Sequence, residues 1–269
     1  MRFLGENSML GKLLKYDLKK NMRWLWILFV CAIASAGISR GFSELGKNIG
    51  FFRVLGILFD SIFYALVVNS LLQPFLRGFM NFAKSLYGDE SYLTHTLPVT
   101  KNQIINSKYI TTIIEILLGF ACVVLSILIR YASPAFIPTI KMILMGIIGE
   151  EFSAILALTL FILLVLVEFL MFISIIYFSI VMGYKYNEKK VLKSFLFTAL
   201  MSMLSSSVLS FVMIIVMLIM GVNLTSAEIV LTGPTFLAII LSGIIVYAIM
   251  ATVFYFLAKQ QFNKGVNVD

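Results

Sequence analysis

The stretch FSAILALTLFILLVLVEFLMFISIIYFSIVM, residues 152–182, decides the fold class of this chain. It contains a single charged residue, Glu168, and is dominated by Leu, Ile, Val and Phe. The hydrocarbon core of a bilayer is about 30 Å thick, and roughly 20 residues of α-helix cross it. Residues 152–182 therefore predict a transmembrane helix that is longer than needed and either tilts or projects beyond the bilayer.

Five further apolar runs share this character, which is typical of a polytopic membrane protein. Of the 269 residues, 61% are hydrophobic and 13% are charged, whereas soluble domains are about 25% charged. Long unbroken apolar runs favour helices, because the strands of a membrane barrel alternate in polarity. We predict an all-α fold in which residues 1–269 form one transmembrane domain. Its six predicted spans cover residues 24–39, 51–75, 109–129, 152–182, 195–220 and 235–258.

Lysine and arginine are unevenly distributed between the two sides that six spans create. With the N-terminus inside, five of the 21 lie in outer segments and the other sixteen lie in inner ones. The five are Arg40, Lys47, Arg53, Arg130 and Lys141. This bias predicts that both termini are cytosolic. It also accounts for the formal net charge of +8, so we expect contact with a lipid bilayer and no nucleic-acid partner.

Residues 9–23 combine apolar and basic side chains at helical spacing. The apolar face consists of Leu10, Leu13, Leu14, Leu18 and Met22, and the basic face of Lys12, Lys15, Lys19, Lys20 and Arg23. This pattern is typical of an amphipathic helix that lies at the interface of an anionic leaflet. The alternative is a plain basic flank that only orients the first span.

The outer segment, residues 130–151, contains an apolar piece at residues 140–148 that is too short to cross a bilayer. Pro134 and Pro138 precede it. The piece predicts a helix on the outer side that is either interfacial or re-entrant.

Three acidic residues are predicted at membrane depth: Asp60 near the outer side, Glu168 near the middle and Glu115 near the inner side. Buried carboxylates are costly in hydrocarbon, so each is a candidate for the substrate path. Apart from Arg53, at the outer edge of the second predicted span, no Lys or Arg falls inside a predicted span to neutralise them. We expect them to be protonated, to face a hydrated cavity or to be hydrogen-bonded between helices, and they either contact cargo or only pack.

The motifs of intramembrane enzymes are incomplete in this sequence. Glu150 and Glu151 begin like the EExxxR signature of one class of membrane protease, but Ile155 stands at the arginine position. The single histidine, His95, falls in a predicted connector rather than in a span. We therefore expect a chain without catalytic residues of its own.

Metal and nucleotide sites are also not expected in this chain. Cys31 and Cys122 lie inside predicted spans and lack the CxxC spacing of a zinc site. Residues 41–48 approach the P-loop pattern GxxxxGK[ST], but Asn48 replaces the hydroxyl residue that binds magnesium. We expect neither a metal nor a cofactor bound by this chain.

One long inner connector, residues 81–103, joins the second and third predicted spans. It is polar, mixed in charge and still contains apolar side chains. The sequence Thr100-Lys101-Asn102-Gln103 has the form of a capping box, which predicts that a helix begins near Thr100. Pro98 ends any short helix before it.

Within this connector, YGDESYLTHTLPVTK at residues 87–101, followed by Asn106-Ser107-Lys108, matches a recognisable pattern. It resembles the connector of bacterial type-2 exporter permeases of ATP-binding-cassette (ABC) transporters, which reads approximately G-x-E-x-Y-L-x-x-T-L-P-V-[ST]-x-x-x-[IL]-x-x-S-K. The resemblance is close over this stretch. It extends more loosely to the six spans and the amphipathic N-terminal segment.

This resemblance implies that residues 82–103 contain a coupling helix that docks on an ABC ATPase. The positions that it assigns to the contact are Gly88, Asp89, Glu90, Tyr92, Leu93, His95, Leu97 and Pro98. It also implies two ATPase subunits that bind ATP and Mg²⁺, and a second permease chain that is either identical or paralogous.

From the residues and the resemblance together we expect the permease subunit of an ATP-driven exporter in the bacterial cytoplasmic membrane. Such a subunit moves its substrate by alternating access, and the substrate is a peptide, a lipid-like molecule or a drug-like molecule. The alternative is a membrane scaffold or a bacteriocin-immunity protein that transports nothing.

Overall fold

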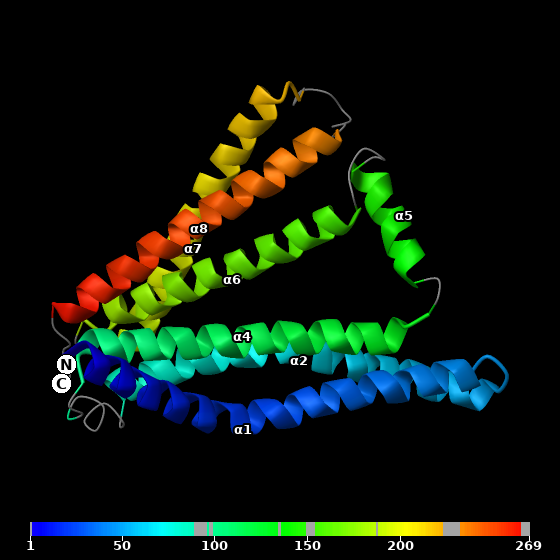
Figure 1. Cartoon of the computed structure of the whole chain (residues 1–269), viewed down its shortest axis with the longest axis horizontal. Coiled ribbons are helices and arrows are strands. Elements are labelled where there is room, and N and C mark those ends of the chain that lie inside the picture. The colour runs from blue at the N-terminus through cyan, green and yellow to red at the C-terminus, as the bar shows by residue number, and fades with distance from the viewer. Residues whose placement is uncertain are drawn as a thin grey trace. The chain divides into compact units, whose positions relative to one another are not determined.

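The computed structural model of the chain describes residues 2–88, 96, 99–133, 136–148, 154–186, 188–222 and 232–264. All regular structure in these residues is helical (Figure 1). The helices are α1 (Arg2–Leu45), α2 (Gly50–Tyr87), α4 (Lys101–Tyr131), α5 (Phe136–Ile148), α6 (Ala154–Gly183), α7 (Lys190–Ile219) and α8 (Gly233–Asn263).

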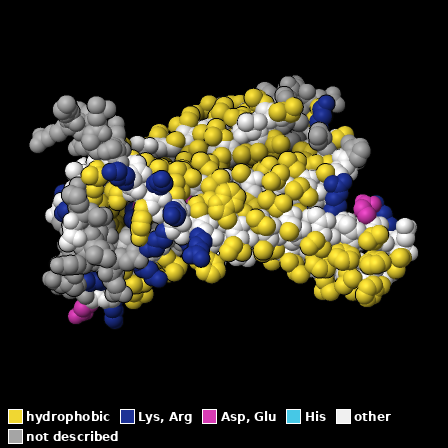
Figure 2. Space-filling model, turned by 60° about the horizontal axis from the view of Figure 1, so that its bottom comes forward, with side chains coloured by type: hydrophobic (Ala, Val, Ile, Leu, Met, Phe, Trp, Pro, Cys, Tyr) yellow, Lys and Arg dark blue, Asp and Glu magenta, His cyan; other side chains and the backbone are white. Residues whose placement is uncertain are grey.

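Six of these helices are long and apolar enough to cross a membrane, namely all but α5. Each of the six overlaps one predicted span, which confirms the all-α, six-span fold class and a multi-pass membrane protein. Figure 2 shows hydrophobic side chains over most of the visible surface, with many of the Lys and Arg side chains toward its left end. The 13 residues of α5 extend about 20 Å, so the apolar piece at residues 140–148 is a helix too short to span.

The basic segment at residues 9–23 is not a separate element. Helix α1 runs without interruption from Arg2 to Leu45 and includes the first predicted span. Its basic side chains are exposed and its leucines are half-buried, as the amphipathic pattern predicts. Because the segment continues directly into the span, its position at the membrane interface stays a prediction.

The chain divides into two compact units, residues 1–133 and 134–269. In the first unit α1, α2 and α4 all pack against one another. In the second unit α6 packs against both α7 and α8, and α5 lies against α6. The first unit contains the described ends of the connector and two of the three predicted acids.

The connector begins and ends in ordered helix. Helix α2 continues to Tyr87, so residues 82–87 are its last turns rather than loop. At the other end, Thr100 forms the predicted capping box. Its Oγ1 accepts a hydrogen bond from the Gln103 backbone N–H at 3.3 Å, and Gln103 Oε1 accepts one from the Thr100 backbone N–H at 2.9 Å. This local motif was correctly predicted because it depends only on neighbouring residues.

Helices α2 and α4 approach closely where glycine removes a side chain. A Cβ atom placed on Gly119 would lie 2.5 Å from the backbone oxygen of Ser70 and 3.4 Å from a side-chain carbon of Pro74. A Cβ atom on Gly78 would lie 2.4 Å from a methyl carbon of Thr112. Since transmembrane helices associate mainly through close packing, these glycines set the distance between α2 and α4.

We predict that Gly119→Ala lowers the stability of the purified chain by about 1–3 kcal/mol, because the backbone of Ser70 cannot move aside without shifting a whole helix. The matched control is Gly37→Ala in α1, where an added Cβ atom meets nothing within 4 Å. This control should be neutral or slightly stabilising, since alanine is the better helix former. Thermal unfolding in detergent measures both variants, and an equal effect of the two substitutions would contradict the packing argument.

Candidate functional site

The three acids predicted at membrane depth occupy different environments. Glu115 is fully buried in the first unit, Asp60 is partly buried in the same unit, and Glu168 is exposed on α6 in the second unit.

Glu115 joins three helices through hydrogen bonds. Its Oε1 accepts a hydrogen bond from Asn21 Nδ2 of α1 at 2.7 Å. Asn21 Oδ1 in turn accepts one from Asn81 Nδ2 of α2, also at 2.7 Å. The relative exposure of Glu115 is 0% and that of Asn21 is 7%. A single chain of side chains thus connects α4, α1 and α2.

One helical turn before Asn21 on α1, Asp17 forms an ion pair with Lys108 of α4. Lys108 Nζ is 2.6 Å from Asp17 Oδ1, and Ser107 Oγ donates a hydrogen bond to Asp17 Oδ2 at 3.1 Å. The Asp17 side chain is 6% exposed and that of Lys108 is 17% exposed. Asp17 and Asn21 occupy successive turns of α1, and Ser107 and Glu115 lie two turns apart on α4. Two polar rows therefore face each other.

Between Ser107 and Glu115 on this face of α4 lies Thr111, which completes what we call the Glu115 cluster. Its members are Asp17, Asn21, Asn81, Ser107, Lys108, Thr111 and Glu115. Two of its buried oxygen atoms, Thr111 Oγ1 and Glu115 Oε2, have no hydrogen-bond partner among the described residues. An unmade hydrogen bond of this kind costs about 1–3 kcal/mol. Among the described residues, the other buried side-chain nitrogen and oxygen atoms of the cluster have hydrogen-bond partners.

An apolar group follows the Glu115 cluster along α1 and α4. It consists of buried Leu25, Phe29, Ala32 and Cys122, with Met22, Leu28, Ile33, Leu66 and Leu118 packed against them. We call it the Phe29 cluster. It separates Glu115 from the polar residues at the far end of the first unit.

Asp60 forms an ion pair at that far end. Arg130 Nε and Nη2 donate hydrogen bonds to its two carboxylate oxygens, at 2.9 and 3.1 Å. Ser39 Oγ also donates to Asp60 Oδ1. The expectation that no basic residue neutralises the acids is therefore wrong for Asp60. Arg130 lies one residue beyond the predicted span, but α4 extends to Tyr131 and carries it to the carboxylate.

The same end of the first unit has further cationic side chains. Arg40 donates hydrogen bonds from Nη1 to the Ile129 carbonyl at 3.1 Å and from Nη2 to the Ala132 carbonyl, so it caps the C-terminus of α4. A pocket of about 390 Å³ lies beside Asp60. It is lined by Ser43, Gly46, Lys47, Arg53, Gly56, Ile57 and Asp60.

Glu168 interacts with another helix of the second unit. Its carboxylate lies near the Tyr247 hydroxyl of α8. The side chain is nevertheless exposed on α6. This acid is therefore available for contact with lipid, substrate or another chain.

The residues assigned to ATPase contact fall almost entirely outside the described residues. Gly88 is the C-cap of α2, and its backbone N–H donates to the Lys84 carbonyl at 3.0 Å. The other seven, Asp89, Glu90, Tyr92, Leu93, His95, Leu97 and Pro98, lie outside the described part of the chain. Their role stays a prediction.

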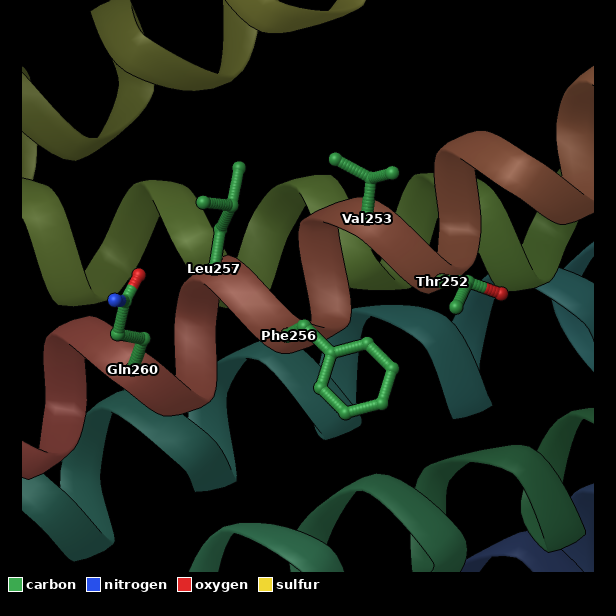
Figure 3. A pocket seen from close by; sticks show the side chains of 5 residues that line it. All are labelled: Thr252, Val253, Phe256, Leu257 and Gln260. Carbon is green, nitrogen blue, oxygen red and sulfur yellow. The ribbon is translucent and has the colours of Figure 1, made fainter.

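A groove on the second unit follows one face of α8, as Figure 3 shows. It is lined by Thr252, Val253, Phe256, Leu257 and Gln260. All five residues belong to a single helix and none is ionisable, so the groove suits contact with an acyl chain better than chemistry. Among the described residues, His, Cys, Asp and Glu side chains do not gather in groups of three that could hold a metal ion.

The sequence analysis did not predict several polar partners in these sites, among them Asp17, Asn21, Lys108 and Arg130. The available signal was spacing, because Asp17 and Asn21 lie four residues apart on the apolar face of residues 9–23. Ser107, Thr111 and Glu115 repeat the same spacing on α4.

Comparison of the chain with protein-family models, with curated proteins and with solved structures found no match. The geometry of the first unit and the connector sequence are therefore the basis for a functional proposal.

We predict that Lys108→Met lowers the free energy of unfolding by about 3–5 kcal/mol, because it leaves the buried carboxylate of Asp17 without its cation. Adding Asp17→Asn should recover part of this loss, since the unpaired charge is then removed as well. The control is Lys47→Met, which breaks an exposed ion pair with Glu44 and should leave the unfolding temperature unchanged. An additive double variant would show that Asp17 and Lys108 are not coupled.

Proposed function

We propose that this chain is the permease subunit of a type-2 ABC exporter driven by separate ATPase subunits. The observation that carries the proposal is the sequence at residues 87–108, which resembles the ATPase-contacting connector of that class. Its position between two membrane-spanning helices, α2 and α4, supports the proposal. The six spans agree with the layout that the resemblance implies.

The packing at the two ends of the connector would allow it to transmit force from an ATPase to α2 and α4. Phe82 and Leu86 in the last turns of α2 are 0% exposed, and Ile104 and Ile105 in the first turns of α4 are 4% and 1% exposed. Both helices also pack against α1. Because these ends are held by buried side chains, a force on the connector would move α2 and α4 together rather than bend a loose loop.

In the proposed mechanism, the ATPase subunits bind ATP and Mg²⁺ and close on one another. The connector transmits this closure to the spans, which alternate between inward-open and outward-open states. A second permease chain, identical or paralogous, completes the path for a peptide, a lipid-like or a drug-like substrate. The proposed location is the bacterial cytoplasmic membrane, with both termini in the cytosol.

The proposal predicts that an ABC ATPase is encoded beside this chain and forms a stable complex with it. Tyr92→Ala combined with Leu97→Ala should weaken the complex at least tenfold and abolish ATP-driven transport, because two large apolar side chains of the contact are removed. Co-purification and ATPase activity in lipid nanodiscs measure the effect.

The matched control is Tyr186→Ala combined with Leu192→Ala. These are the same residue types, 44% and 53% exposed, in the segment between the fourth and fifth predicted spans, which is also predicted to be on the inner side. The control should leave the complex intact. An equal loss in both double variants, or no complex with the unaltered chain, would contradict the proposal. A stable complex without transport would instead favour the scaffold or immunity function.

The proposed orientation has a direct test. In a chain whose Cys31 and Cys122 are replaced by alanine, a membrane-impermeant maleimide added to intact cells should label Lys47→Cys but not Glu188→Cys. Both positions are exposed in the structure, so accessibility in the folded chain does not limit the reaction. The reverse pattern of labelling would place the termini outside.

A further inference from the structure

Two unpartnered oxygen atoms lie in the interior of the first unit. Thr111 Oγ1 and Glu115 Oε2 are buried and make no hydrogen bond within the part of the chain that the structure describes. They belong to residues 2% and 0% exposed, one turn apart on the same face of α4. All around them, the other members of the Glu115 cluster are paired. The missing hydrogen bonds in this cluster are therefore confined to these two oxygen atoms.

The hydrogen bonds of Glu115 suit a neutral carboxyl better than a carboxylate. A buried carboxylate is stable when several donors surround both oxygens, but Glu115 receives one N–H, at Oε1, from Asn21. A protonated carboxyl carries its own donor on Oε2 and needs one acceptor. The Thr111 hydroxyl, which lies one turn away on the same face of α4 and is itself without a partner among the described residues, can serve as this acceptor through one water molecule.

The charged groups that face Glu115 come from all three helices. Asp17 of α1 repels a carboxylate, while Arg77 of α2 and Lys108 of α4 attract it. Lys108 is already engaged by Asp17 at 2.6 Å, and Arg77 Nε reaches Gln73 Oε1 at 3.5 Å. Neither cation forms an ion pair with Glu115 within the described residues.

We propose that Glu115 is a reversible proton-binding site whose proton sits on Oε2, is shared with Thr111 through one water molecule, and exchanges with water only at the Asp17–Lys108 end of the first unit. In the loading step a hydronium ion at that end becomes water and the carboxylate becomes a carboxyl. No other bond forms or breaks. This site does not depend on the proposed export function.

Burial on the two sides of Glu115 supports exchange at one end only. Toward the N-terminus of α4, Lys108 is 17% exposed and the polar row of Ser107 and Thr111 leads inward. In the opposite direction the Phe29 cluster follows, in which Leu25 and Phe29 are 1% and 3% exposed. Apolar side chains of this kind offer no site to a proton.

The test is infrared difference spectroscopy on the full chain in lipid nanodiscs during a pH step. We expect a C=O band of a neutral carboxylic acid in apolar surroundings. Glu115→Gln should abolish this band, and Glu168→Gln, which alters the exposed acid of α6, should retain it. A band that is absent from the unaltered chain, or that survives Glu115→Gln, overturns the proposal. A carboxylate that binds only a water molecule would give this negative result.

A second pair of variants keeps the test decisive if Glu115→Gln fails to fold. Thr111→Val should shift the frequency of the band, because it removes the hydroxyl that shares the proton. Thr112→Val is the matched control, since Thr112 Oγ1 donates to the Lys108 carbonyl at 3.0 Å instead. Equal frequencies in Thr111→Val and the unaltered chain would overturn the role of Thr111.

In vesicles that hold the chain in one orientation, a pH step on the side of the N-terminus should change the band. A step on the other side should not change it within the same time. A response to both sides would overturn exchange at one end.

Discussion

The hydrogen bonds from Asn81 to Asn21 and from Asn21 to Glu115 hold the first unit together. Helices in a bilayer gain little from burying apolar side chains against one another, because lipid tails are equally apolar. Direct contacts between polar groups and close approach at glycines must therefore select the packing. The Asn21 amide bonds both neighbouring helices at once, so its position fixes the rotation of α1 relative to α2 and α4. The ion pairs at the two ends of the unit follow from that rotation.

The sequence predicts the fold well because span length and composition are properties of one helix at a time. All six spans and the capping box at Thr100 follow from neighbouring residues, and the structure contains them. The pairs Asp17–Lys108 and Asp60–Arg130 do not follow, because they depend on how two helices are turned toward each other. Hydropathy carries no such information. The continuity of α1 was missed for a related reason, since a change in composition need not interrupt a helix.

For the candidate site, sequence and structure contribute different parts. The residues proposed to contact an ATPase come from the resemblance at residues 87–101 alone. The buried ends of α2 and α4 supply the mechanical support for it. The sequence identified Glu115 as a candidate because an acid at membrane depth is costly, and in the structure this residue belongs to the buried polar Glu115 cluster. The spacing of Thr111 and Glu115 places both on one face of α4, but the lack of a hydrogen-bond partner for Thr111 among the described residues appears only in three dimensions.

The position of the Phe29 cluster has an electrical consequence. A membrane potential falls mainly across the part of the protein that excludes water and polar groups, and in the first unit this part is the Phe29 cluster. A full elementary charge that crosses a potential of 100 mV changes its energy by about 2.3 kcal/mol. Glu115 lies on the N-terminal side of this barrier, so a proton that reaches it crosses only a small part of the field. Its occupancy therefore follows the acidity of one compartment and is nearly insensitive to voltage.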